Sequence, residues 1–444
     1  MVFLNESNGL IVKEKIFVII CILFLLSCGA PSDDSRDERT DVIRLTYWPA
    51  PNPQEMELAD SLVKVWNRNN PHIQVRMQPI PVGQSTEEVL LASIAAGTTP
   101  DICSNIWPGA LYDFTRAGGL IPFEKFSDFD SVLTSRVPSE LLETFRSPDG
   151  SVYQIPWKTN PVMMIYNKRI LRELGYEEPP RIYSEFIRMG RELAERREND
   201  KRFDVWMGER DIRPIWWQRF FDFLPFYYAA SGGKTLFENH TVAFVNEYAE
   251  AVIAFFSECY REKVFPRTFS HQQDPFLLER MATNFAGSWQ IPTIRRYAPH
   301  IEFGVAPVPV PDDHEGPIYT YGDFKNISIF STTRYPEASW EFVKFLIEAD
   351  HDLLLLEIAN QIPVRGDLLT NPLFTDFFND NPDMVLFAEQ AVYTRSVDEV
   401  ADIKEILDAL SQEYEAAVVY GRRSPAEAIQ RAARRAELII EWNK

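Results

Sequence analysis

Residues 42–77 read VIRLTYWPAPNPQEMELADSLVKVWNRNNPHIQVRM, and this stretch decides the fold class. Apolar and polar side chains alternate over residues 42–48, which is typical of a β-strand. Apolar side chains then recur at helical spacing over residues 58–66, and an Asn-Asn-Pro triplet at 69–71 ends that helix. Alternation returns over residues 73–77. The stretch therefore predicts a strand, a helix and a second strand.

The same succession of elements continues down the chain. Residues 87–96 have a helical pattern, residues 102–106 form a short apolar strand, and residues 110–117 form a further helix before a Gly-Gly pair. This succession predicts an α/β fold with a parallel sheet flanked by helices. Ligands of such sheets bind at the carboxyl ends of the strands, which here are the loops that start near Trp48 and Asn105.

A second α/β lobe is expected from about Ser151 onward. Strands are predicted over residues 162–166, 303–307 and 326–330. Helices are predicted over residues 168–174, 183–196, 215–230, 246–263, 336–347 and 398–420. Ser424 begins a Ser-Pro-Ala-Glu capping box, which opens a last amphipathic helix that ends at Trp442.

Length and composition exclude several classes of protein. The 444 residues are long for one core and suit two lobes, each able to bury its own apolar surface. The formal net charge of −20 argues against a nucleic-acid partner, because phosphate binding needs a basic surface. Four cysteines are too few for a disulfide scaffold.

The N-terminus has the features of a secretory leader. Two lysines precede an apolar run, residues 16–26, that is too short to span a bilayer as a helix. The run ends in Leu-Leu-Ser-Cys-Gly, which resembles a bacterial lipobox and implies cleavage before Cys28 and lipid attachment to that cysteine. We expect a signal peptide over residues 1–27, a flexible tether over 28–41, and an exported body held at the membrane, facing the periplasm or the cell exterior. The alternative is an uncleaved membrane anchor with an incidental cysteine.

Six segments resemble, in order, motifs of the extracellular solute-binding proteins (family 1) of ABC importers, in particular the carbohydrate-binding group that includes maltose-binding proteins. The segments are residues 96–102 (AGTTPDI), Tyr112 with 118–122 (GGLIP), 153–168 (YQIPW to YNK), 179–186 (PPRIYSEF), 304–309 (GVAPVP) and 337–342 (EASWEF). None of these motifs is specific alone. Their shared order, together with the lipobox, is what identifies the chain as a member of this family.

The resemblance implies a type II fold like that of periplasmic binding proteins, in which several strands join two α/β lobes and the ligand lies in the cleft between them. Chain crossings are implied near residues 150–156, 321–325 and 390–395. Lobe 1 would comprise residues 42–152 and 323–390, and lobe 2 residues 153–322 and 391–444. A ligand that contacts both lobes only in the closed form would drive closure.

A sugar site needs aromatic platforms and a few polar donors and acceptors. The candidate ligand-binding residues, in loops where the family carries ligand contacts, are Trp48, Asn105, Trp107, Trp157, Asn160, Trp289, Tyr321 and Asp323. Packing in the core is the ordinary alternative for each of them, because tryptophan and tyrosine are largely buried on average.

No catalytic or metal-binding motif stands out. The six histidines are scattered without zinc-site spacing, and the chain has no Walker loop or G-x-S-x-G elbow. We therefore expect no catalytic residue, no metal site and no cofactor. The resemblance implies a lipid-anchored, monomeric receptor that captures a sugar or oligosaccharide by hinge closure and delivers it to ABC permease subunits. Two alternatives stay open: the same fold binding a polyamine, peptide, metal chelate or phosphorylated compound, and a surface glycoside hydrolase with paired carboxylates.

Overall fold

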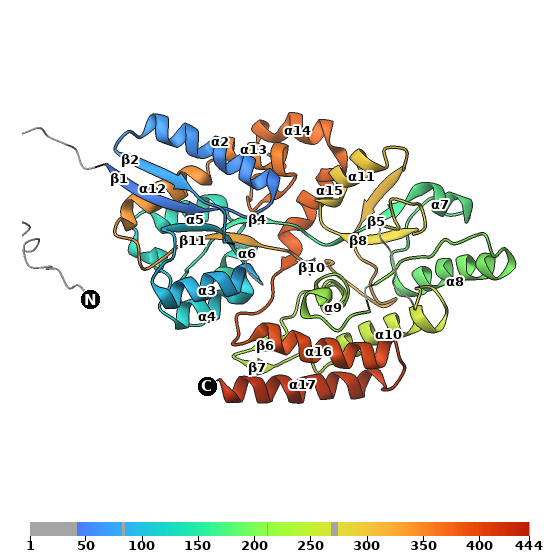
Figure 1. The fold of residues 1–444 in the computed structure, drawn as a ribbon. Helices are drawn as coiled ribbons and strands as arrows, with labels where there is room; N and C mark the ends of the chain where they lie inside the picture. Colours follow the sequence, from blue (N-terminus) through green and yellow to red (C-terminus); the bar gives the residue numbers. More distant parts are fainter. Residues whose placement is uncertain (1–41, 82–84, 211, 268–273, 444) are drawn as a thin grey trace, which may run out of the picture. The chain divides into compact units, whose positions relative to one another are not determined.

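The computed structural model describes residues 42–443 apart from 82–84, 211 and 268–273. The predicted signal peptide (1–27), the tether (28–41) and Cys28 lie outside the described residues. In the part of the chain that is described, no helix combines the length and the apolar character needed to cross a bilayer. Two main sheets, each with its own helices, organise the body (Figure 1).

The first sheet has six strands in the order β12-β4-β11-β3-β1-β2. Their bounds are β1 (Ile43–Trp48), β2 (Ile73–Met77), β3 (Ile102–Ile106), β4 (Ile155–Thr159), β11 (Lys325–Ile329) and β12 (Ile362–Pro363). β1 is parallel to both β2 and β3, so the parallel arrangement predicted from the sequence is confirmed. β11 is antiparallel to β3 and β4, and β12 is antiparallel to β4.

Helices pack on this sheet through the apolar side chains that recur at helical spacing. In α2 (Pro53–Asn69), Leu58 and Trp66 are buried in the core that also contains the inner face of β1. The side chain of Asn52 caps α2 by accepting a hydrogen bond of 2.9 Å from the backbone N–H of Glu55. The other helices in residues 86–145 and 336–359 are α3 (Thr86–Ala96), η1 (Pro108–Ala110), α4 (Leu111–Arg116), η2 (Phe123–Lys125), α5 (Phe129–Arg136), α6 (Ser139–Leu142), η3 (Glu143–Phe145), α12 (Pro336–Leu346), α13 (Ala349–Leu354) and the π-helix η5 (Leu355–Ala359).

The second sheet has three antiparallel strands in the order β8-β5-β9. They are β5 (Met163–Asn167), β8 (Thr283–Ala286) and β9 (Phe303–Ala306), and a hairpin of β6 (Phe237–Glu238) and β7 (Thr241–Val242) lies apart from them. The helices of this part are α7 (Lys168–Glu173), α8 (Tyr183–Asn199), η4 (Trp216–Phe220), α9 (Phe223–Ser231), α10 (Glu247–Arg261), α11 (Gln290–Tyr297), α16 (Ile403–Val418) and α17 (Pro425–Trp442). α16 and α17 lie side by side and both contact α10 (Figure 1).

The chain passes from the first sheet to the second after β4. The first passage, expected near residues 150–156, lies later, because residues 155–159 are all buried and pair with both β11 and β12. Pro161 then forms a β-bridge with Gly322, in the passage that returns from β10 (Thr320–Tyr321) to β11. That second passage coincides with the one expected near residues 321–325.

The third passage follows β12. After it come η6 (Pro372–Phe374), α14 (Thr375–Asp380), α15 (Pro382–Gln390), η7 (Ala391–Tyr393) and β13 (Thr394–Arg395). Phe377 and Phe387 share a core with Met163 and Ile165 of β5, so α14 and α15 pack with the second sheet. The sequence assigned residues 323–390 to lobe 1 and expected the passage near residues 390–395. It predicted no helix over residues 375–390, and local pattern does not indicate which sheet these residues cover.

Two predicted helices are shorter than their apolar pattern indicated. Residues 215–230 divide into η4 and α9 at Asp222, whose backbone is non-helical and whose side chain caps α9. The carboxylate of Asp222 is buried and ion-paired with Arg219 at 2.9 Å, which fixes the break. The helix expected over residues 398–420 starts only at Ile403, because Asp402 adopts a left-handed φ of 50°.

Candidate functional site

A cavity of about 750 Å³, called here the large cavity, opens at the carboxyl ends of β1 and β3. Its walls come from the loop after β1 and the first turn of α2, from the segments beside β4 and β11, from the end of η5, and from α11. The lining residues are Ala50, Pro51, Asn52, Gln54, Glu55, Asn105, Asn160, Trp289, Pro292, Thr293, Arg296, Tyr297, Asp323, Lys325, Ile358, Ala359, Asn360 and Gln361. α11 packs with the second sheet, so the cavity lies between the elements of the two sheets, where the strand ends predict a ligand.

Four of the eight predicted residues meet at the large cavity. Asn105 is the penultimate residue of β3, Asn160 follows β4, Asp323 lies in the second passage, and Trp289 immediately precedes α11. These residues are far apart in the sequence, and the order of strands and passages brings them together.

The other four predicted residues do not line the large cavity. Trp48, Trp107, Trp157 and Tyr321 are each at most 7% exposed. The Trp107 ring centre lies 5.4 Å from that of Trp216, in η4. Tyr321 stacks on Phe220 with ring centres 4.6 Å apart. In the structure these four rings are packing residues, and a ligand contact for them stays a prediction.

Trp289 and Tyr297 supply the aromatic surface of the large cavity. Trp289 is partly exposed, and its ring edge packs on Phe221 with centres 6.2 Å apart. The turn before it needs glycine, because a Cβ on Gly287 would overlap the indole of Trp289. Tyr297 is 66% exposed, and the guanidinium of Arg296 lies over its ring. An exposed ring held in place from behind suits the flat apolar face of a ligand.

A buried ion pair forms the polar floor of the large cavity. Glu55, in the first turn of α2, pairs with Lys158 of β4, and the side chains are 4% and 0% exposed. Glu55 Oε1 also accepts hydrogen bonds from Asn52 Nδ2 at 2.9 Å and from Gln361 Nε2 at 3.0 Å. Burial of Lys158 lowers its pKa, and Glu55 acts in the opposite direction by favouring the charged form. The floor is therefore polar, with its charges matched.

The remaining charges at the large cavity are also mostly matched. Lys325 Nζ lies 2.9 Å from Asp323 Oδ1. Arg296, on the exposed end of α11, adds one positive charge at the rim. The cavity as a whole is thus polar and close to neutral rather than strongly acidic or basic.

Sequence reasoning missed Glu55, Lys158, Arg296, Tyr297 and Gln361. The sequence pattern could have indicated Glu55, because it lies in the first helical turn after the loop that follows β1, and Asn52 caps its backbone N–H. No local signal marked Gln361, whose partner Glu55 is 306 positions away in the chain.

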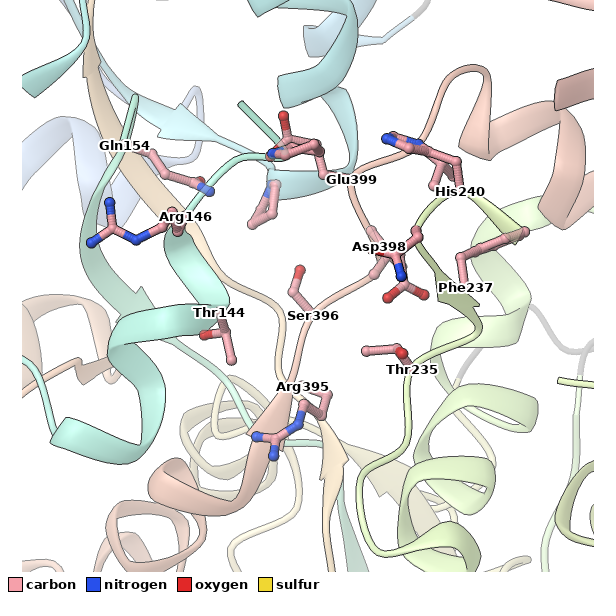
Figure 2. A pocket seen from close by; sticks show the side chains of 15 residues that line it. Thr144, Arg146, Gln154, Thr235, Phe237, His240, Arg395, Ser396, Asp398 and Glu399 are labelled. Atoms are coloured by element: carbon pink, nitrogen blue, oxygen red, sulfur yellow. The ribbon is translucent and has the colours of Figure 1, made fainter. Parts of the chain in front are cut away.

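A second cavity of about 430 Å³, called here the small cavity, shares no lining residue with the large one. Figure 2 shows Thr144, Arg146 and Gln154 on one side and Thr235, Phe237 and Asp398 on the other, with Ser396 and Arg395 between them. Of the predicted site residues, none lines it.

Two carboxyl groups of the small cavity have raised pKa values. Burial raises the pKa of Asp398 to about 7, against hydrogen bonds from the backbone N–H groups of Leu236 and Phe237. Burial likewise raises the pKa of Glu399 to about 7, although Ser147 Oγ donates to it at 2.9 Å. Both groups therefore titrate near neutral pH.

In the described ranges, no group of three or more His, Cys, Asp or Glu side chains is placed to hold a metal ion. The two described cysteines, Cys103 and Cys259, are buried and free, and burial raises the pKa of each thiol. This favours the neutral thiol, which is the unreactive form.

Known proteins with a similar sequence bind solutes. A family model for bacterial extracellular solute-binding proteins matches residues 61–385. A maltotriose-binding protein of Pyrococcus abyssi is 26% identical over 341 residues, which cover 74% of this chain and 68% of the relative.

Solved structures share the fold over nearly all of the described chain. An uncharacterized protein of Listeria monocytogenes EGD-e has a TM-score of 0.81 at 26% identity, covering 90% of this chain and 100% of the other. The cyclic α-maltosyl-1,6-maltose binding protein of Arthrobacter globiformis has a TM-score of 0.76 at 19% identity, covering 90% of this chain and 99% of the other. The two-lobed type II fold implied by the six sequence motifs is therefore confirmed. Proteins of the matched family are binding proteins rather than enzymes, and this chain belongs to the bacterial extracellular solute-binding proteins.

Proposed function

We propose that the protein is the receptor of an ABC importer and that it binds a saccharide in the large cavity. The observation that carries the proposal is the composition of that cavity: the partly exposed Trp289 and the exposed Tyr297 line the space beside the uncharged amides of Asn105 and Asn160. Aromatic rings suit the C–H faces of a sugar, and amides suit its hydroxyl groups, since an amide both donates and accepts hydrogen bonds. The names of the relatives, which describe maltotriose and cyclic maltosyl-maltose binding, support the same ligand class.

Binding would close the two lobes around the solute. Trp289 and Tyr297 belong to elements of the second sheet, whereas Glu55 and Asn105 belong to elements of the first. A solute that contacts both sets gains more contacts in the closed form, and this difference in contact is what drives closure.

Membership of an extracellular family places the protein among exported proteins. Lipid attachment at Cys28, a tether over residues 28–41 and delivery to permease subunits by a monomer complete the proposal. These features rest on the lipobox-like sequence and on the family resemblance. Growth in radiolabelled palmitate tests the anchor: wild-type protein should be labelled and the Cys28→Ala variant should not.

The charge pattern disfavours the alternative functions. Glu55 and Asp323 each have a lysine partner, so the cavity has no unmatched carboxylate to hold a polyamine. A glycoside hydrolase needs two carboxyl groups free to exchange protons with the substrate, and these two are engaged in ion pairs.

Isothermal titration calorimetry tests the ligand class. The expected result is saturable one-to-one binding of one or more members of a panel of linear and cyclic glucosides that includes maltotriose, with no heat from spermidine or from a sugar phosphate. Binding of spermidine or a phosphate compound alone would contradict the saccharide proposal. Hydrolysis of the sugar during the titration would contradict the non-enzymatic role.

A further inference from the structure

Five polar side chains form one series at the floor of the large cavity, called here the amide relay, in which an ion pair joins the first two members and hydrogen bonds join the rest. Its members in order are Lys158, Glu55, Gln361, Asn160 and Ser288. Gln361 Nε2 donates to Glu55 Oε1 at 3.0 Å, and Asn160 Nδ2 donates to Gln361 Oε1 at 3.2 Å. Ser288 Oγ then donates to Asn160 Oδ1 at 2.9 Å. The relay begins in β4 and ends at the residue before Trp289.

The charge on Glu55 determines the direction of every bond in the relay. Glu55 is ion-paired with the buried Lys158, and an ionised carboxylate can only accept hydrogen bonds. The –NH₂ group of Gln361 must therefore face Glu55, so its oxygen faces Asn160. Asn160 must then present its own –NH₂ to that oxygen and its carbonyl oxygen to Ser288. The orientation of both amides follows from chemistry rather than from a choice of rotamer.

The relay uses only one of the two N–H bonds of each of its amides. Each amide has two N–H bonds, and one from Gln361 and one from Asn160 are used within the relay. Both side chains line the large cavity, and for the second N–H of each no protein acceptor is found among the described residues. The acceptor oxygens of the relay are already engaged. The wall therefore offers N–H donors to acceptor oxygens of a solute.

The backbone before Gln361 is built to hold it in this position. The π-helix η5 is followed directly by its C-cap Asn360, which adopts a left-handed φ of 51°. The carbonyl oxygen of Asn360 also lies 2.7 Å from Ser288 Oγ, so Asn360 O and Asn160 Oδ1 share the single hydroxyl proton of Ser288. π-Helical turns and left-handed residues other than glycine are uncommon and concentrate at functional sites.

We propose that Gln361 is a positioning residue that sets the specificity of the large cavity: it orients the amides of the relay so that the wall donates hydrogen bonds to the hydroxyl and ring oxygens of an uncharged polyhydroxyl solute. The proposal rests on the saccharide function above. A cationic solute such as spermidine offers only donors and cannot satisfy these N–H groups.

Replacement of Gln361 tests the proposal through solute affinity. Gln361→Met keeps the length of the side chain and removes both hydrogen bonds, and Gln361→Glu places a second carboxylate against Glu55. Each variant should bind the best saccharide of the panel about 10- to 100-fold more weakly, since buried partners are left unpaired. Affinities within about 3-fold of wild type, in variants whose far-ultraviolet circular dichroism is unchanged, would overturn the proposal.

Gln54 provides the matched control. It lines the same cavity in the first turn of α2, is exposed, and has no side-chain hydrogen bond among the described residues. Gln54→Glu introduces the same charge at the cavity without touching the relay, so it should weaken binding by a smaller factor than Gln361→Glu does. A loss equal to that of Gln361→Glu would show that charge at the cavity, not orientation of the amides, is responsible.

A ligand-free measurement separates failure of the relay from failure of the saccharide function. Gln361→Met and Ser288→Ala are combined in a double-mutant cycle, and urea unfolding is measured without ligand. If the relay couples the two residues, the second substitution should lower the free energy of unfolding less when the first is already present. The expected non-additivity is a factor of about 3 or more in the unfolding equilibrium constant. The same cycle with Gln54→Met should be additive. Additivity in both cycles would overturn the relay. Non-additivity in the Gln361→Met cycle, in a protein whose wild type binds no sugar, would contradict only the saccharide function.

Discussion

Trp289 and the Glu55–Lys158 pair show how single residues prepare the large cavity. The indole is held from behind by Phe221 and by the close approach of Gly287, so its exposed part needs no reorganisation before a solute arrives. The ion pair is buried, and its effect is to hold neighbouring amides in one orientation rather than to add net charge. Preorganised groups of this kind reduce the entropy lost on binding.

Replacement of Trp289 by alanine should weaken solute binding and leave folding nearly intact. The side chain is partly exposed and contributes contact area to the cavity, so a loss of about 2 kcal/mol in binding free energy is expected. Calorimetric titration with the best saccharide gives the first quantity and thermal unfolding gives the second. Trp107→Ala is the contrast, because that ring is 2% exposed and its removal should cost about 3–5 kcal/mol of folding stability. If Trp289→Ala is as destabilising as Trp107→Ala, Trp289 belongs to the core.

Replacement of Lys158 by methionine should destabilise the fold strongly. It removes the cation from beside Glu55, whose side chain is only 4% exposed. Leaving a buried charge unpaired in this way typically costs about 3–5 kcal/mol of folding stability. Urea unfolding measures the change. Lys64→Met is the control, because Lys64 pairs with Asp60 on the surface and should contribute less than about 1 kcal/mol. Equal, small effects of the two substitutions would mean that the Glu55–Lys158 pair is not buried in solution.

The sequence predicted part of this site. Asn160 and Trp289 were predicted because each occupies a recognisable place in a family motif or a strand-end loop. Trp48, Trp107, Trp157 and Tyr321 come from the same loops, yet their rings pack inside. Neighbouring positions in an extended segment point to opposite faces, and composition does not say which face meets the cavity. The contact between Glu55 and Gln361 joins two elements that become neighbours only in the finished fold.

At the scale of elements, local pattern predicted the strands and helices better than their boundaries. β1, β2, β3, α2 and α17 lie where periodicity and capping placed them. A crossing near residues 150–156 was expected from the family resemblance, and only the pairing of β4 with β11 and β12 shows that residues 155–159 belong to the first sheet. The break at Asp222 depends on a buried ion pair with Arg219, which periodicity does not detect.

The segment between β13 and α16 should make stability depend on pH. Asp398 and Glu399 have pKa values of about 7, raised by burial from ordinary values of 3.8 and 4.5. Between about pH 4 and 7 the folded state therefore holds protons that the unfolded state has released. Folding stability should fall as pH rises through this window and stay lower above it.

The Glu399→Gln variant checks this dependence. It cannot ionise, and its amide oxygen can still accept from Ser147 Oγ, so it should be more stable than wild type at pH 8 by about 1 kcal/mol and similar at pH 5. Urea unfolding at the two pH values measures the difference. Glu405→Gln, at an exposed position of α16, should show no such pH-dependent gain. The account would be contradicted if the free energy of unfolding of the wild-type protein rose between pH 5 and 8 and Glu399→Gln removed that rise.

At the scale of the whole molecule, the arrangement of the two sheets explains why the solute site is where it is. The carboxyl ends of β1 and β3, the passages after β4 and β12, and the start of α11 meet at one cavity. The sequence motifs predicted the two-lobed fold because their order follows the order of these elements. They did not predict which lobe α14 and α15 cover, since that choice depends on packing between segments far apart in the chain.

A crystal structure of the protein grown with the tightest-binding saccharide of the panel tests the central claim most directly. The account predicts sugar density in the large cavity, with one ring face on the indole of Trp289 and hydroxyl oxygens within hydrogen-bond distance of Asn160 Nδ2 and Gln361 Nε2. Sugar density in the small cavity beside Asp398, with the large cavity holding only solvent, would contradict it.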